Sequence, residues 1–354
     1  MTLDLPSNRE EAWRWADLGG IAAAAALAPV ARPEAQFLDL PGAKLLFVDG
    51  VLDEAASDLH RVTVGDHVPG DHALARRATH GWSLRLDTPA VAHPVQVVHV
   101  ATGAQNHLAA EIVLGEDTAA QVVETFVGAG WSNRATRIRL GRAARLMRAV
   151  RMVQAAGFVS TRDEAELGEG ASYVATTLAA GDQGVRVDAA ITLAGAGGYA
   201  EFGGALLTRG RTKQECAVRV RHAEPTGQSH QLWRAVSADQ SQASLAAAVE
   251  VARHAQKTDG EQSLRGLLLD RTATVNLKPE LEIFADDVKC AHGATVGELD
   301  ARALFYMASR GIPAPRARAL LTRAFVADAL DRIGDEVVRG AFAADADAWL
   351  ERAL

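Results

Sequence analysis

The stretch Val185-Arg-Val-Asp-Ala-Ala-Ile-Thr-Leu193 decides the fold, because its apolar and polar residues alternate with a period of two. Successive side chains of an extended strand point to opposite sides. The odd-numbered residues therefore form one apolar face, while Arg186, Asp188 and Thr192 lie on the other face. This pattern predicts a strand with one side buried and one side in water.

Similar short runs recur every ten to fifteen residues between about Gly81 and Lys289, with Gly, Asp or Asn between them. No helical period interrupts them, so the region is predicted to form a sandwich, a barrel or a β-solenoid. A β region of about 200 residues is large for one sandwich, whereas stacked coils accommodate such a length. No strict repeat motif is visible. Examples of these runs are residues 95–100, 109–114, 136–140 and 216–222.

Helical patterns occur at the two ends of the chain. An alanine-rich stretch begins near Asn8, where Trp13, Ala16, Leu18 and Ile21 form an inward-facing stripe. Near the other end, Thr295-Val-Gly-Glu298 fits a capping box that would start a helix at Leu299. We expect helices over about 299–310, 315–333 and 336–354.

These patterns divide the chain into an N-terminal helical and mixed region over residues 1–80, a β core over 81–293 and a C-terminal helical module over 294–354. Short alternating segments at residues 43–48 and 61–64 indicate that strands begin before the core proper. We expect the β region to stay folded when the C-terminal module is removed.

Composition excludes several classes of protein. The 354 residues are 48% hydrophobic with a net charge of -7, and no Lys/Arg cluster is interleaved with aromatic residues, so no nucleic-acid partner is expected. Two cysteines cannot form a disulfide framework. The longest apolar run, Ile21–Ala31, is too short to cross a bilayer, which indicates a cytoplasmic protein without a membrane partner. No phosphate-binding loop is present, so the chain is predicted not to hydrolyse ATP itself, and no hydrolase motif is found in the sequence.

Cys290 and His292 are the residues with the most distinctive chemistry. In an extended segment they would share one side with Val288. A thiol and an imidazole suit iron, zinc or copper(I), but iron-sulfur clusters and structural zinc usually need four ligands. Any metal here would need donors from elsewhere, including another chain. The alternative is a buried cysteine beside a hydrogen-bonded histidine.

Other polar candidates are weaker. Cys216 shares its side of a strand with Val218 and Val220, which indicates a thiol in the core. His222 is a minor candidate ligand beside Pro225. Asp286 and Asp287 are adjacent and would point to opposite sides of a strand, so a turn or bulge explains them better than paired acid and base groups.

A resemblance to a known family rests on several blocks that together span most of the chain. The most specific blocks are Lys278-Pro-Glu-Leu-Glu-Ile, Asp286-Asp-Val-Lys-Cys-Ala-His-Gly-Ala-Thr-Val-Gly297 and Ser309-Arg-Gly-Ile312, and Glu11-Ala-Trp-Arg-Trp-Ala-Asp-Leu18 is moderately specific. With these blocks the chain resembles the SufB/SufD family of iron-sulfur cluster assembly scaffold proteins. The short chain, the Trp-Arg-aromatic motif and the two cysteines make it most similar to the SufD branch.

The resemblance implies a right-handed parallel β-helix that pairs with a SufB-like subunit. It also implies that the C-terminal helices dock a SufC-like ABC ATPase, and that Cys290 and His292 lie near the heterodimer interface. An iron-sulfur cluster would be held there transiently in the complex, and no cofactor would be bound stably by the chain alone. Flavin binding and homodimer formation in isolation are left open. Candidate ATPase contacts are Leu299, Phe305, Tyr306, Leu320 and Phe325.

Two other functions compete with this one. A β-helical carbohydrate-active enzyme would need a cleft rich in aromatics and carboxylates, but aromatic residues make up 5% of the chain, with three tyrosines. A purely structural solenoid would use its C-terminal helices as caps against aggregation. Binding of an ATPase would separate the assembly scaffold from both alternatives.

Overall fold

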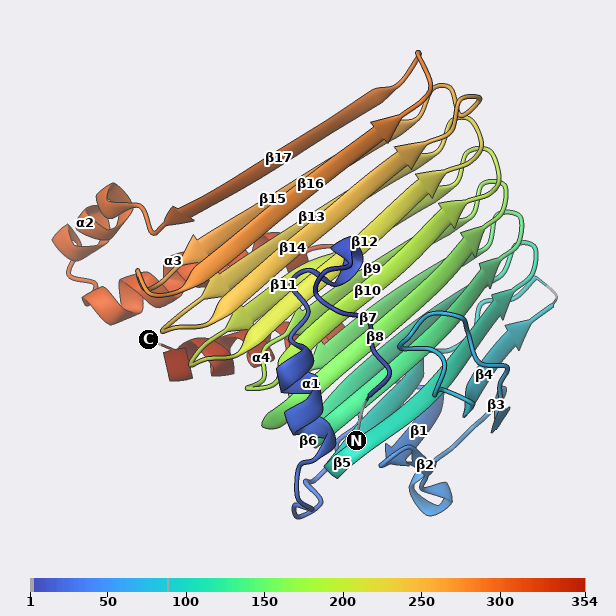
Figure 1. The fold of residues 1–354 in the computed structure, drawn as a ribbon, viewed down its shortest axis with the longest axis horizontal. Coiled ribbons are helices and arrows are strands. Elements are labelled where there is room, and N and C mark those ends of the chain that lie inside the picture. The colour runs from blue at the N-terminus through green and yellow to red at the C-terminus, as the bar shows by residue number, and fades with distance from the viewer. Residues whose placement is uncertain (1–2, 88, 354) are drawn as a thin grey trace.

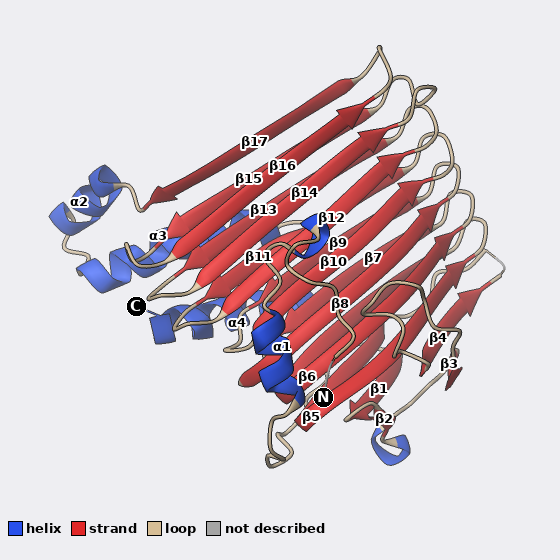
Figure 2. Cartoon of the chain, in the orientation of Figure 1, coloured by secondary structure: helices blue, strands red, loops and turns tan. Residues whose placement is uncertain are grey.

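The structure, a computed structural model that describes residues 3–87 and 89–353, is a parallel β-solenoid of about eight turns with helices near both ends (Figure 1). Figure 2 shows that the helices lie outside the stack of strands. The predicted mainly-β class is therefore confirmed, and of the architectures that periodicity left open the solenoid is the one formed.

The elements follow one another along the chain as a short helical start, a long run of strands and three final helices. The helices are η1 (Glu11–Trp13), α1 (Leu18–Ala25), η2 (Glu54–Ala56), α2 (Ala301–Ser309), α3 (Ala314–Leu330) and α4 (Glu336–Ala353). The strands are β1 (Ala43–Val48), β2 (Val51–Leu52), β3 (Val62–Asp66), β4 (His80–Leu86), β5 (Val95–Leu114), β6 (Ala119–Leu140), β7 (Arg145–Met152), β8 (Ala156–Leu167), β9 (Ser172–Ala179), β10 (Gly184–Leu193), β11 (Tyr199–Thr208), β12 (Lys213–His222), β13 (Gln228–Ser237), β14 (Gln242–Val251), β15 (Asp259–Leu268), β16 (Thr274–Ile283) and β17 (Lys289–Glu298).

Two parallel sheets make up the solenoid, because from β8 onward each strand pairs with the strand two places later. We call them the even sheet (β8, β10, β12, β14, β16) and the odd sheet (β7, β9, β11, β13, β15, β17). Val185 pairs with Gln214, and Gln214 with Ala243, so one turn here takes 29 residues. The repeat is one of backbone register, which explains why no sequence motif reveals it.

The long strands β5 and β6 pass from one sheet to the other. The first part of β6 pairs with β7 and the second part with β8. Between these parts Gly128 and Gly130 have φ values of 92° and 139°, a region that L-residues rarely enter. A β-carbon on Gly128 would also lie 2.0 Å from the carbonyl oxygen of Ala101, so only glycine fits this bend.

The main core lies between the two sheets. One column of side chains runs through Val187, Cys216, Leu245 and Leu277 in register. Cys216 is 1% exposed, and burial raises the pKa of its thiol. The prediction of a core thiol is confirmed.

The N-terminal segment, residues 3–27, crosses the outer side of the even sheet, and we call it the strap (Figure 1). Of the predicted stripe, Trp13, Ala16 and Ile21 are buried and Leu18 is half-buried, in a small core that also includes Trp131 and Phe158. The helical stretch is split into η1 and α1, and Asp17 caps α1 by accepting a hydrogen bond from the Gly20 amide.

The C-terminal helices start later than the capping box predicted. Thr295 and Glu298 belong to β17, because this strand stays paired with β15 as far as Glu298. The residue that caps α2 is Asp300, which accepts a hydrogen bond from the Arg302 amide at 2.9 Å. The strand region therefore continues beyond residue 293.

Helices α3 and α4 pack on the odd sheet and share a second core with it. Phe342 and Trp349 are fully buried there beside Leu207 and Val236. The Arg151 guanidinium on β7 donates two hydrogen bonds to Asp345 on α4, at 2.6 and 3.0 Å. The expectation that the β region stays folded without this module conflicts with this shared core. In the described part of the chain, no helix combines the length and apolar character needed to cross a membrane.

Candidate functional site

Cys290 and His292 lie on β17, the last strand of the odd sheet. Among the described residues this strand pairs with β15 alone, which sets Cys290 opposite Gly260 and His292 opposite Gln262. Gly260 and Gln262 are buried, so the two donors extend inward-facing columns of the solenoid. The structure thus places both donors on one side of the strand. No described coil lies beyond β17, and His292 is accordingly exposed and Cys290 half-buried.

Cys290 lies above a glycine. A β-carbon on Gly260 would be 3.4 Å from the Cys290 sulfur and 3.7 Å from the Ser229 hydroxyl oxygen. Because glycine has no β-carbon, a small gap is left between that sulfur and that hydroxyl. Burial raises the pKa of the Cys290 thiol, against the opposing effect of a backbone contact with Gly260. The thiol must therefore lose a proton before it can bind a metal ion.

His292 ends an internal column of hydrogen-bonding side chains. Gln231 and Gln262 precede it in register, and their amide groups donate to the carbonyls of Ala248 at 3.0 Å and Glu280 at 3.2 Å. Each glutamine thereby links the odd sheet to the even sheet. The imidazole of His292 has no such backbone acceptor among the bonds of the described residues, and is free to act at the end of the stack.

His222 is buried beside Ser229, which lies in the neighbouring column that ends at Cys290. Its Nε2 atom lies 2.8 Å from the Ser229 hydroxyl, and burial lowers the pKa of the imidazole to about 4. A neutral imidazole already engaged with a hydroxyl fits a structural residue better than a metal ligand.

Across residues 3–87 and 89–353, no group of three or more His, Cys, Asp or Glu side chains is placed to hold one metal ion. Cys290 and His292 therefore provide two donors of the four that a cluster or structural zinc usually needs. Any metal site built on these two residues would need further ligands beyond those that the described residues place here.

The candidate ATPase contacts fall into two groups. Phe305 and Tyr306 on α2 are 77% and 58% exposed, and Leu320 on α3 is 40% exposed. Leu299 and Phe325 are instead partly buried against the second core. The structure therefore leaves the first three residues accessible to a partner.

A buried ionic network inside the solenoid is not among the sequence-based predictions. Glu124 accepts a hydrogen bond from Arg148 at 2.8 Å and lies 3.1 Å from His99 Nε2, and Arg148 also pairs with Asp163. All four side chains are nearly inaccessible to solvent. Burial lowers the pKa of His99 to about 4, so the imidazole is neutral. The signal was available, since Glu124 interrupts the apolar alternation between Val122 and Phe126.

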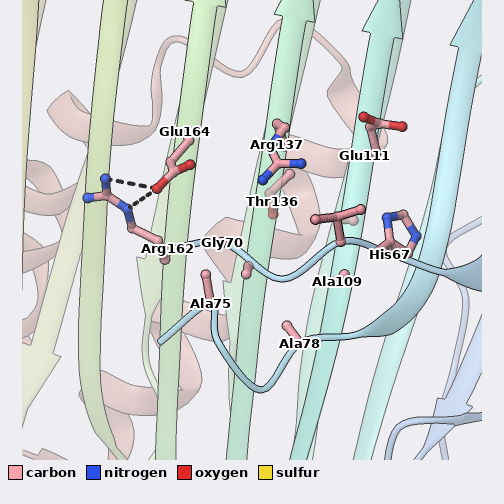
Figure 3. Close-up of a pocket in the computed structure, with 13 residues that line it drawn as sticks. His67, Gly70, Ala75, Ala78, Ala109, Glu111, Thr136, Arg137, Arg162 and Glu164 are labelled. Atoms are coloured by element: carbon pink, nitrogen blue, oxygen red, sulfur yellow. Dashed lines mark hydrogen bonds and ion pairs between the residues drawn. The ribbon is translucent and has the colours of Figure 1, made fainter. Parts of the chain in front are cut away.

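A small hollow lies under the loop that precedes β4 (Figure 3). Figure 3 shows Arg137 between Glu111 and Glu164, its neighbours in register on β5 and β8. The hollow measures about 30 Å³, which suits a water molecule but no larger ligand. It is not a candidate for the functional site.

Comparison with known families identifies the class of protein. Residues 97–325, from β5 into α3, match the SufBD core domain of the SUF system for FeS cluster assembly. The chain therefore belongs to this family and is a subunit of Suf-type iron-sulfur cluster assembly. Within the family it is most like SufD.

Individual relatives support this assignment. The iron-sulfur cluster assembly protein SufD of Escherichia coli is 27% identical over 367 residues, which cover 94% of this chain and 86% of that protein. SufD of Bacillus subtilis is 29% identical over 147 residues, covering 42% of this chain and 34% of the relative. An iron-sulfur cluster assembly SufBD family protein of Synechocystis is 38% identical over 133 residues, covering 38% of this chain and 29% of the relative.

Proposed function

We propose that this chain is a scaffold subunit of a Suf-type complex, without an enzymatic activity of its own. Its last coil pairs with a SufB-like subunit, and its C-terminal helices dock a SufC-like ABC ATPase. The observation that supports the proposal most is the open C-terminal end of the solenoid.

The two ends of the solenoid differ. At the N-terminal end, β2 and β3 pair antiparallel with their neighbours and cover the first coil. At the C-terminal end, β16 and β17 each have one strand partner among the described residues, so each presents an unpaired backbone edge. Ile283, Phe284 and Val296 on these strands and the turn after β16 are 38%, 53% and 44% exposed. An open edge with exposed apolar side chains favours pairing with another chain.

Cys290 and His292 lie within this open end. A SufB-like subunit paired at β17 would bring further donors to them, and an iron-sulfur cluster would be the cargo assembled between the chains. A neutral imidazole can bind iron directly, while the cysteine contributes after loss of its proton. This arrangement explains why this end of the chain has an incomplete donor set.

The surface for the ATPase centres on α2. This helix has no buried residue within the described chain, and it presents Phe305 and Tyr306 to solvent. Leu320 borders a groove of about 430 Å³ between α3 and α4. We assign the contacts to Phe305, Tyr306 and Leu320, whereas Leu299 and Phe325 hold the helices against the odd sheet.

The test is co-expression with a SufB-like and a SufC-like protein, followed by native mass spectrometry. We expect one copy of this chain per SufB-like subunit, with the ATPase bound. Val296→Asp should weaken pairing at least about tenfold by placing a charge in the apolar interface. Val337→Asp is the matched control, because Val337 is 43% exposed on α4, far from the edge. Equal pairing by both variants would contradict an interface at β17.

A further inference from the structure

The strap does not lie flat on the even sheet. Between strap residues 11–15 and the outer side of β10, β12, β14 and β16 lies a cleft of about 460 Å³, which we call the strap cleft. Pockets of about 300–1,000 Å³ are typical of small-molecule sites. The cleft is thus large enough for a ligand and lies outside the proposed partner surfaces.

The centre of the floor of the strap cleft is apolar, and charged side chains bound it, with Asp188 and Lys278 at the two ends of the register column. Ala217 and Ala246 are neighbours in register, and Ala190 and Ala248 flank Arg219 in the adjacent column. Their methyl groups leave room where longer side chains would fill the space. Trp15 lines the cleft from the strap and, unlike Trp13, is not buried. Methyl groups and an indole that line one cleft are both suited to contact the faces of an aromatic ring.

One end of the floor has a hydrogen-bond acceptor. Glu215 accepts a hydrogen bond from Arg186 through Oε1 at 2.7 Å, and no partner of its Oε2 occurs among the described residues. Asp188, by contrast, uses its two oxygens for Arg162 and Arg186. Of these two carboxylates, Glu215 is therefore the one with an oxygen available to a ligand.

The other end of the floor carries Arg219, and Glu280 lies two strands away in the same register column. Glu215, Ala217 and Arg219 project from the same side of β12 and span about 13 Å along the strand. The Arg219 side chain is 55% exposed and makes only long ion pairs, 3.5 Å from Glu250 and 3.8 Å from Glu282. Arg14 on the strap has no ion pair among the described residues and also lines the cleft. Along β12 the order is thus acceptor, apolar surface, cation.

We propose that the strap cleft binds a purine nucleotide. The ring lies on Ala217 and Ala246 beneath Trp15, its N–H donors face Glu215, and the phosphate contacts Arg219 and Arg14. A purine nucleotide has a plane with donors at one end and an anion at the other, in the same order as the cleft. This site is independent of the proposed assembly role, since none of its residues lies on β17 or the C-terminal helices.

The experiment measures binding to the full chain by isothermal titration calorimetry with GMP, AMP, guanosine and inorganic phosphate as probes. We expect saturable one-to-one binding of GMP or AMP, at least about tenfold weaker binding of guanosine, and no binding of phosphate alone. Arg219→Gln should weaken nucleotide binding about tenfold and leave guanosine binding unchanged.

Ala246→Leu fills the floor from its outer, half-buried side and should abolish nucleotide binding without changing the melting temperature. Thr192→Leu is the matched control, because Thr192 lies on the outer side of β10 beyond the cleft, and it should bind like the unmodified chain. The proposal is overturned if neither nucleotide binds saturably, if phosphate alone binds as well as the nucleotides, or if stably folded Ala246→Leu binds normally.

Discussion

The guanidinium carbon of Arg186 lies 4.1 Å from the centroid of the Trp13 ring. The same guanidinium donates to the Ala12 carbonyl at 2.8 Å, and the Trp13 ring stacks on His72 with centroids 5.9 Å apart. Three segments distant in sequence therefore meet around one indole. These contacts fasten the strap to the even sheet. A further contact joins strap residue Glu11 to Lys278 on β16, whose Nζ donates a hydrogen bond to the carboxylate at 2.6 Å.

Replacing Trp13 with Ala should release the strap. The indole is 3% exposed, so its loss should lower the free energy of unfolding by about 3 kcal/mol or more. Urea denaturation and limited proteolysis within residues 3–27 measure the two effects. Trp15→Ala is the control and should cost at most about 1 kcal/mol, since Trp15 is not part of the buried core. Similar losses for both variants would show that Trp13 does not fasten the strap.

The strap also shows how far sequence patterns reach. The alternation in Val185–Leu193 and the spacing of Trp13, Ala16 and Ile21 are local, so they correctly predicted a strand and a buried apolar stripe, although the helix expected there is split into η1 and α1. They contain no information on which sheet the stripe covers, because that depends on Arg186, more than 170 residues away from Ala12. The strap cleft was unpredictable for the same reason.

Stability should fall as the pH falls from about 6.5 toward 4. Burial lowers the pKa of His222 in the folded chain from its ordinary value of 6.5 to about 4. The negative charge of Asp259 acts in the opposite direction but is the smaller effect. Between these values the unfolded chain binds a proton that the folded chain does not, so the stabilisation is complete above pH 6.5 and is lost on acidification. His222→Gln should reduce the stability difference between pH 7 and pH 5 by about 2 kcal/mol in urea denaturation. The exposed His254 serves as control, and an effect of His254→Gln equal to that of His222→Gln would refute the assignment.

The C-terminal helices should be inseparable from the solenoid. Trp349 on α4 is fully buried against the odd sheet, so Trp349→Ala should lower the free energy of unfolding by about 3–5 kcal/mol in a single transition. The control is Val337→Ala, at a 43% exposed position of the same helix, which should cost less than about 1 kcal/mol. Two separate unfolding transitions in the Trp349 variant would instead show an independent helical module.

Sequence patterns predicted the existence of these helices within a few residues but not their packing. Periodicity identifies the apolar stripe of a helix, but it does not show which surface that stripe covers. The packing of α4 depends on contacts such as the hydrogen bond between Arg151 and Asp345, which are 194 positions apart. The predicted capping box failed because Thr295 and Glu298 fit the local motif, while pairing with β15 kept them extended. The placement of Cys290 and His292 on the same side of one strand was predictable, because it depends on strand geometry alone.

Docking of the ATPase should depend on the exposed aromatic residues of α2. Phe305→Ala with Tyr306→Ala should weaken binding of a SufC-like protein by at least about 2 kcal/mol, because such anchors dominate interface energies. The control is Phe284→Ala, which removes a 53% exposed ring in the turn between β16 and β17, whereas α2 follows the end of β17. This variant should leave ATPase binding intact. Surface plasmon resonance with the folded variants measures both. Loss of binding in the Phe284 variant alone would move the docking site to the open edge.

The final prediction concerns His292. Its side chain is exposed on an edge strand, so His292→Ala should change the melting temperature little and alter the free energy of unfolding by no more than about 0.5 kcal/mol. The same variant should lower the yield of iron-sulfur cluster, measured by visible absorbance and iron content, in the complex with SufB-like and SufC-like proteins. Cys290→Ser should lower the yield by the same amount or less, since its thiol has a raised pKa and ionises with difficulty.

His254→Ala, also at an exposed position, is the matched control and should give a normal yield. If His292 were structural, its replacement would lower the melting temperature first, and the cluster yield would fall only in proportion to the folded protein. A stably folded His292→Ala complex with normal cluster yield would remove His292 from cluster assembly.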